Sequence, residues 1–192
     1  FCQNVSKIKN DQKMNSMEQK TNEVAILANG CFWCTEAIFQ QLKGVEKVEP
    51  GYIGGITENP TYEQVCTGKT NHAEALRIYF DSSVLSYDEL LEVFFATHDP
   101  TTLNRQGGDI GTQYRSEIFY TTANQKQVAE FFVKELNEEN LFDKPVVTKV
   151  SEAVKFWVAE DYHKNYYENN KEKAYCNAVI SPKVSKFQKY FA

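Results

Sequence analysis

The chain has 192 residues, of which 42% are hydrophobic and 14% aromatic, so it can bury the core of one compact domain. Its 21 basic and 26 acidic side chains give a formal net charge of -5, which excludes an overall electrostatic case for binding nucleic acid. The apolar runs fall far short of the roughly 20 residues that a membrane helix needs, so we expect no transmembrane segment.

The first 22 residues are polar, rich in Lys, Asn and Gln, and lack hydrophobic periodicity, which predicts a flexible leader before a domain over residues 23–192. Cys2 followed by a polar tether is typical of a lipid-anchored envelope protein whose signal peptide has been removed. A cloning remnant, or a cytosolic protein that starts at Met14 or Met17, explains the same residues equally well. Both a cytoplasmic and a cell-envelope location therefore stay open.

The domain begins with alternating strand and helix patterns. Residues 23–29 ("EVAILAN") alternate toward a short buried strand, and residues 35–44 ("TEAIFQQLKG") have apolar positions at helical spacing with Gly44 as a stop. Residues 45–55 predict a second strand, which we expect Pro50 to break. This part of the chain therefore predicts a strand, a helix and a strand.

The middle of the chain combines two regular elements with a long loop. Residues 73–81 ("AEALRIYFD") alternate as a third strand, and a capping box of Ser86 and Glu89 opens a helix over residues 86–98. Residues 98–114 contain three glycines, many polar groups and no periodicity. Loops of this length are usually functional, so we expect this loop to frame a site, with a plain surface excursion as the alternative.

The C-terminal part continues the alternation. We expect a strand over residues 115–121, a long amphipathic helix over 124–140, short strands over 145–150 and 155–159, and a helix over 160–170. The pattern as a whole predicts an α+β fold with a mixed β-sheet.

The five cysteines indicate redox chemistry or metal binding, because a chain of this length does not need disulfides for stability. Cys31 and Cys34 form one C-x-x-C pair, whereas the other cysteines and the three histidines are scattered. A zinc site needs about four ligands, usually in paired short spacings, so we expect no metal.

The stretch "GCFWC" at residues 30–34 is a candidate reactive site. If a helix begins near Cys31, its thiol faces unpaired N–H groups and the positive end of the helix dipole, which lowers a thiol pKa. Cys34 lies on the same helix face, within reach of a disulfide. Phe32 and Trp33 are suited to line an apolar substrate group. From these residues alone a catalytic thiol, a thioredoxin-like exchanger, a redox sensor and two buried structural cysteines all stay open.

Several motifs carry a resemblance to a known family. They are "GCFWCTEAIF", "GYIGG", "NPTYEQVCTGKTNHAEALRIYFD", "LLEVFFATHDPTTLNRQGGDIGTQYRS" and "AEDYHKNYY". Over roughly residues 24–190 and in this order, the chain resembles peptide methionine sulfoxide reductase A. The resemblance implies a two-layer α/β sandwich with a central mixed β-sheet and a ferredoxin-like core, long irregular loops and a C-terminal tail. We expect the protein to be a monomer.

The resemblance implies roles for individual residues. Cys31 is then the thiolate that attacks the sulfur of methionine sulfoxide, and Glu74 is the acid that protonates the sulfoxide oxygen, which requires burial to raise its pKa. Selectivity for the S epimer is expected, since one enzyme serves each epimer. The substrate-binding residues are expected to be Phe32 and Trp33 around the methyl group, Tyr62 and Tyr114 at the sulfoxide oxygen, and Asp109 nearby.

Attack leaves Cys31 as a sulfenic acid, which a second thiol must resolve. In many family members position 34 is glycine and the resolving cysteine lies in a glycine-rich C-terminal tail, whereas this chain has Cys34, and its tail has Cys176 and no glycine. We predict Cys34 as the resolving cysteine because its short tether gives a high effective concentration, with Cys176 as the alternative. The resemblance implies oxidised proteins and free methionine sulfoxide as substrates, thioredoxin or another dithiol as reductant, and no cofactor.

Overall fold

The structure is a computed structural model that describes residues 21–191. The leader expected over residues 1–22 therefore lies outside the described residues, apart from its last two positions. The strands are β1 Asn22–Asn29, β2 Val45–Ile53, β3 Ala73–Asp81, β4 Arg105–Gln106, β5 Asp109–Ile110, β6 Ser116–Tyr120, β7 Lys149–Glu152 and β8 Trp157–Val158. The α-helices are α2 Phe32–Phe39, α3 Tyr62–Cys66, α4 Tyr87–Thr97, α5 Ala123–Glu138, α6 Tyr166–Asn169 and α7 Ser181–Phe191.

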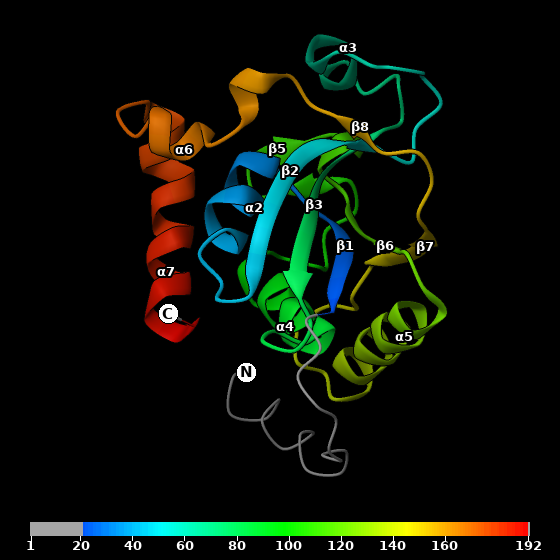
Figure 1. The fold of residues 1–192 in the computed structure, drawn as a ribbon. Coiled ribbons are helices and arrows are strands. Elements are labelled where there is room, and N and C mark those ends of the chain that lie inside the picture. Colours follow the sequence, from blue (N-terminus) through cyan, green and yellow to red (C-terminus); the bar gives the residue numbers. More distant parts are fainter. Residues whose placement is uncertain (1–20, 192) are drawn as a thin grey trace.

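A six-stranded sheet of order β7-β6-β1-β3-β2-β8 forms the framework (Figure 1). Its neighbouring strands are antiparallel except for β6 and β7, which are parallel, so the expected mixed sheet is confirmed. The segments β1, α2, β2, β3, α4 and β6 follow one another in the chain, while their strands lie in the order β6-β1-β3-β2. This is the ferredoxin-like arrangement that the resemblance implied.

The larger core lies between the sheet and the helices on one of its faces. Alternate residues of β1 and β3, such as Leu27 and Ile78, are fully buried in one cluster with Phe39 of α2 and Phe94 of α4. Helix α7 packs against α2 and α4 at the edge of this layer, where Figure 1 shows it beside α2. The helix layer therefore holds α2, which carries the C-x-x-C pair, against the centre of the sheet.

Several elements agree closely with the sequence patterns. Strand β3 spans residues 73–81 as expected, and β1 extends the predicted 23–29 by one residue. The capping box is present: the Ser86 hydroxyl accepts the N–H of Glu89, and the Glu89 carboxylate accepts the N–H of Ser86. The strongly periodic and capped segments were therefore predictable.

Two predictions near the reactive stretch were wrong in their details. The helix expected over residues 35–44 begins at Phe32, with Cys31 at its N-cap position. It ends at Phe39, before the expected stop. Pro50 does not break β2: it lies opposite Leu76 in β3, and its carbonyl accepts the N–H of Ala159 at 2.9 Å. A proline is tolerated in a strand where the ladder does not need its N–H.

Further differences concern the second half of the chain. The loop over residues 98–114 contains the β4–β5 hairpin and a 3-10 turn, and the strand expected at 145–150 begins only at Lys149. The helix expected over 160–170 is divided into a 3-10 turn and the short α6, because Asn165 between them has a left-handed backbone with φ of 52°. Hydrophobic spacing does not predict this left-handed residue, so the interruption of the helix was not expected.

The C-terminal segment is not an irregular tail. A π-helical turn, Cys176–Ile180, runs directly into α7. Its apolar side chains Cys176, Ile180, Val184 and Phe187 are buried in the main core. These residues recur at intervals of three and four, which is the spacing of an amphipathic helix.

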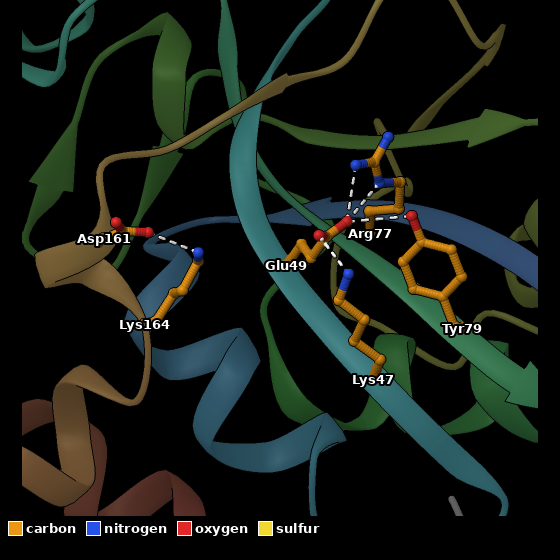
Figure 2. Close-up of polar contacts among 6 residues, drawn as sticks. All are labelled: Lys47, Glu49, Arg77, Tyr79, Asp161 and Lys164. Carbon is orange, nitrogen blue, oxygen red and sulfur yellow. Dashed lines mark hydrogen bonds and ion pairs between the residues drawn. The ribbon is translucent and has the colours of Figure 1, made fainter.

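Glu49 forms an ion network on β2 and β3 that makes stability depend on pH (Figure 2). Its carboxylate accepts Arg77 Nε at 2.9 Å, Arg77 Nη2 at 2.6 Å and the Tyr79 hydroxyl at 3.0 Å, and Lys47 Nζ lies 2.6 Å away. Burial alone would raise the pKa of Glu49, but these donors together lower it to about 2. The network therefore stabilises the fold only while Glu49 is ionised.

Glu49→Gln is expected to lower the free energy of unfolding at neutral pH by about 1 kcal/mol, because it removes the charge from this network. Since the folded pKa lies below the unfolded value, the stabilisation is present above the unfolded pKa and is lost as pH falls toward about 2. Urea unfolding at neutral and at acidic pH should show that acid lowers the free energy of unfolding less in the variant than in the wild type. Asp161→Asn, at the exposed pair with Lys164, is the matched control and should have a smaller effect (Figure 2). Equal acid sensitivity of wild type and Glu49→Gln would contradict the assignment.

Candidate active site

A tight turn from β1 into α2 places Cys31 at the helix start. Gly30 has φ of 102°, and a Cβ at this position would lie 2.7 Å from Cγ of Gln106, so the turn requires glycine. The Cys31 carbonyl then accepts the N–H groups of Cys34 at 3.1 Å and Thr35 at 3.3 Å. The first turn of α2 therefore brings the two cysteines onto the same face.

Both thiols are free and nearly buried; Cys31 is 6% and Cys34 5% exposed. Burial, followed by the neighbouring Cys34, raises the pKa of Cys31 well above its usual range. The expected lowering by the helix start was therefore wrong for Cys31, because burial outweighs it. The pKa of Cys34 is instead lowered, chiefly because the Cys31 thiol donates a hydrogen bond to it.

Glu74 on β3 reaches the same helix start. Its side chain is 1% exposed, and its Oε2 accepts the backbone N–H of Phe32 at 3.0 Å. Burial raises the pKa of Glu74 well above its usual range, and the neighbouring Cys31 adds to this, while the Phe32 N–H acts in the opposite direction. The carboxyl therefore keeps its proton at a pH where an exposed glutamate has lost it, as a general acid requires.

Three further predicted residues come from two segments of the chain and lie near Glu74 or the thiols. Tyr62 is the first residue of α3, Tyr114 ends the 3-10 turn Thr112–Tyr114, and Asp109 belongs to β5. Burial and then the Glu74 charge raise the pKa of both tyrosines, so both hydroxyls remain proton donors. The long loop does contribute to the site, through Asp109 and Tyr114.

Phe32 and Trp33 form an aromatic surface beside the thiols. The Phe32 ring is 1% exposed and lies 5.8 Å from Tyr52 and 6.4 Å from Tyr62. Trp33 stacks on Tyr166 at 3.7 Å with an angle of 5° between the rings, and its Nε1 donates to Nδ1 of His163 at 2.9 Å. Both rings are therefore held in fixed orientations.

Sequence reasoning assigned no role to the residues that hold this surface. His163 is fully buried, with Nε2 directed at Glu160 Oε2 at 3.5 Å, and Glu160 also accepts the Tyr52 hydroxyl and the Tyr62 N–H, each at 2.7 Å. His163 and Glu160 belong to the motif "AEDYHKNYY", which was the available signal. Their partner Trp33 lies 130 residues away from His163, and no local pattern predicts that contact.

Tyr175 was also missed, although it lies near the reactive pair. Its hydroxyl donates to Asp109 Oδ2 at 2.7 Å, and its ring centroid lies 5.9 Å from that of Trp33. The next residue, Cys176, is a free thiol that is fully buried within the π-helical turn, and burial raises its pKa. The candidate resolving cysteine of the tail is therefore held inside a packed helix.

Residues 21–191 contain no group of three or more His, Cys, Asp or Glu side chains arranged to hold a metal ion. In the same part of the chain, no helix is long and apolar enough to cross a membrane. The chemistry available in the described site is that of two thiols, a protonated carboxyl and several hydroxyls.

Comparison with known proteins supports this interpretation. A family model described as peptide methionine sulfoxide reductase matches residues 23–192. The peptide methionine sulfoxide reductase MsrA of Deinococcus radiodurans is 54% identical over 92% of this chain and 91% of its own length. The protein of the same name from Acinetobacter baumannii strain AYE is 56% identical over 87% of this chain and 95% of its own.

Two solved structures share the fold. Mxr1 from Saccharomyces cerevisiae in its reduced form has a TM-score of 0.74 and 32% identity, covering 81% of this chain and 89% of its own. Methionine sulfoxide reductase A of Corynebacterium diphtheriae has a TM-score of 0.70 and 35% identity, covering 80% of this chain and 77% of its own.

Proposed function

The chain belongs to the peptide methionine sulfoxide reductase family and is an enzyme that reduces methionine sulfoxide, and from the site we propose that Cys31 and Glu74 carry this reaction on the S epimer. The observation that carries the proposal is the burial of a thiol next to a carboxyl that retains its proton, beside a fixed aromatic surface. We propose both free and protein-bound methionine sulfoxide as substrates.

In the first half-reaction Cys31 Sγ attacks the sulfoxide sulfur while the oxygen takes the proton of Glu74. The bond formed between the two sulfur atoms then breaks as the hydroxyl group moves from the substrate sulfur to Cys31 Sγ, which gives methionine and a sulfenic acid on Cys31. Glu74 recovers the proton that Cys31 gave up, so methionine is the only product released. The thiol sulfur is oxidised and the sulfoxide sulfur is reduced by two electrons.

The surroundings of Cys31 suit one orientation of the substrate. The aromatic surface of Phe32 and Trp33 can accept the apolar methyl group, while the hydroxyls of Tyr62 and Tyr114 can donate to the oxygen. A site that holds the methyl group and the oxygen at two separate positions presents only one configuration at sulfur correctly to Cys31. This supports selectivity for one epimer.

Cys34 is the proposed resolving cysteine. Its sulfur attacks Cys31 Sγ, the sulfur–sulfur bond forms, and hydroxide leaves and takes up the Cys34 proton to become water. The position of both cysteines in the first turn of α2 and the lowered pKa of Cys34 support this choice. Cys176 would first have to leave a helix in which it is fully buried.

Thioredoxin or another dithiol is the proposed reductant. Thiol–disulfide exchange with such a partner converts the Cys31–Cys34 disulfide back to two thiols and leaves the partner oxidised. The partner gives two electrons to the disulfide, and the enzyme returns to its starting dithiol state.

Separate S and R epimers of methionine sulfoxide, with a dithiol reductant, test the proposed activity. We expect methionine from the S epimer alone. A thioredoxin-like exchanger would instead reduce insulin disulfides and ignore both sulfoxides, and a sensor would show Cys31 oxidation without turnover. Either result would overturn the proposal.

Cys34→Ala and Cys176→Ala form a matched pair that tests the resolving step. Both variants should release methionine in a single turnover, because Cys31 is intact. Recycling by thioredoxin should fall by about 100-fold in Cys34→Ala, since the intramolecular thiol is lost. Steady-state assays with thioredoxin and its reductase measure this. Loss of recycling in Cys176→Ala alone would assign the resolving role to Cys176.

A further inference from the structure

A buried ion pair lies at the end of the sheet where the site residues gather. Strand β1 lies between β3 and β6 (Figure 1). It ends at Asn29 opposite Ser116, the first residue of β6, and β3 begins one residue before Glu74. On either side of Ser116, Arg115 Nε donates to Glu117 Oε2 at 2.5 Å, and the two side chains are 10% and 7% exposed. Because taking two charges out of water is costly, a buried pair adds little stability by itself, so it is a candidate for positioning other groups.

The Arg115 guanidinium joins two segments of the site. Its Nη1 donates to the carbonyl oxygen of Thr112 at 2.9 Å and to that of Asn71 at 3.1 Å. Thr112 begins the 3-10 turn that ends at Tyr114. Asn71 lies two residues before β3, the strand that carries Glu74. One nitrogen of Arg115 therefore connects the backbone that carries Tyr114 to the backbone that leads into Glu74.

Two side chains of the same 3-10 turn make weaker contacts with α3 and the loop after it. Thr112 Oγ1 donates to the carbonyl oxygen of Gly68 at 3.4 Å, and Gln113 Nε2 donates to that of Cys66 at 3.5 Å. Helix α3 begins with Tyr62. Both distances are long for hydrogen bonds, so the guanidinium is the firmer attachment of the turn.

The ion pair is itself held in place from two sides. Glu117 Oε1 accepts the hydroxyl of Ser151 on β7 at 2.7 Å. At Gly54, where φ is 80°, a Cβ would lie 2.9 Å from Arg115 Nη2 and 3.1 Å from the ring of Phe119, so the loop after β2 packs closely over the guanidinium. Lysine would keep the positive charge but lacks the planar fork that directs donors at a carboxylate and at two carbonyl groups together.

We propose that Arg115 is a positioning residue of the first half-reaction, which sets the Tyr114 hydroxyl where the sulfoxide oxygen of the substrate binds. Arg115 acts by holding the turn Thr112–Tyr114 against the strand of Glu74, while Glu117 fixes the guanidinium. A donor stabilises the charge that develops on oxygen only if it is in place before the reaction. This role rests on the proposed function of Tyr114 as a donor to that oxygen.

A double-mutant cycle of Arg115→Lys and Tyr114→Phe tests this role, with the rate of methionine formation in a single turnover as the readout. Tyr114→Phe alone should lower the maximal rate by about 10²-fold, because one donor to the oxygen is lost. Arg115→Lys alone should lower it by about 10-fold, because the donor is misplaced. The sulfoxide concentration that gives half the maximal rate should stay within about 2-fold of the wild-type value, since the contact strengthens in the transition state. In the Tyr114→Phe background, Arg115→Lys should lower the rate by less than about 2-fold, because no hydroxyl is left to position.

Arg77→Lys is the matched control. Arg77 also forms an ion pair with a glutamate, Glu49, but its guanidinium lies over the ring of Phe156 at 4.6 Å. This variant should keep the single-turnover rate of its background in both arms of the cycle. If circular dichroism shows that Arg115→Lys does not fold, Arg115→Met combined with Glu117→Gln takes its place, because the pair of changes leaves no unpaired buried charge.

Equal losses from Arg115→Lys in both backgrounds would overturn this role of Arg115 while leaving Tyr114 as a donor to the sulfoxide oxygen. An increase in the half-saturating sulfoxide concentration at the wild-type maximal rate would also overturn it, because the effect would then lie in substrate binding. A wild-type rate for Tyr114→Phe would instead overturn the function of Tyr114, and the role of Arg115 with it.

Discussion

Cys31→Ser is expected to abolish reduction of methionine sulfoxide, with a loss of at least about 10⁴-fold in the rate of methionine formation. The hydroxyl of serine is a far weaker nucleophile toward sulfur than the thiol of cysteine. Single-turnover release of methionine, followed by chromatography, measures the effect directly.

The matched control for this variant is Cys176→Ala, which removes another buried cysteine but leaves the reactive pair intact. It should still release methionine in a single turnover. Because Cys31 lies at a helix N-cap and is almost fully buried, circular dichroism should confirm that the serine variant is folded. Substantial turnover by a folded Cys31→Ser enzyme would exclude Cys31 as the nucleophile.

Glu74→Gln is expected to slow the first half-reaction by about 10²- to 10⁴-fold, the usual contribution of a positioned general acid. Glutamine preserves the size of the side chain and can still accept the N–H of Phe32, but it has no acidic proton to give. Rapid-quench measurement of methionine in one turnover, across pH, checks this. The wild-type rate should fall as pH rises through the raised pKa of Glu74, and the variant should lack that fall.

Protein stability supplies a control for the same variant. The pKa of Glu74 is raised in the folded protein. Its contribution to the free energy of unfolding is therefore complete below the unfolded pKa and is lost as pH rises through the folded pKa. Glu74→Gln should therefore be at least as stable as wild type at neutral pH, so a slower reaction is not explained by unfolding. Wild-type rates in Glu74→Gln at neutral pH would show that the proton comes from another group.

Local patterns predicted the framework of this fold. Alternation identified β1 and β3, and the Ser86–Glu89 capping box identified the start of α4, because each signal lies within a few residues of the chain. The predictions that failed concern features that local signals do not determine. The left-handed Asn165 and the position of Pro50 depend on contacts with distant segments, which hydrophobic spacing does not report.

The candidate site shows the same limit. The motifs identified Cys31 and Glu74, and the structure brings their side chains together. The thiol pKa was misjudged because the helix start is visible in sequence whereas burial is a property of the whole fold. Tyr175 was missed because its hydrogen bond with Asp109 joins segments that are far apart in the chain.

A peptide map of the enzyme after one turnover with the S epimer and no reductant tests the mechanism most directly. We expect one methionine released per enzyme and a disulfide between Cys31 and Cys34. Methionine release without modification of Cys31, or no reaction with the S epimer, would contradict it.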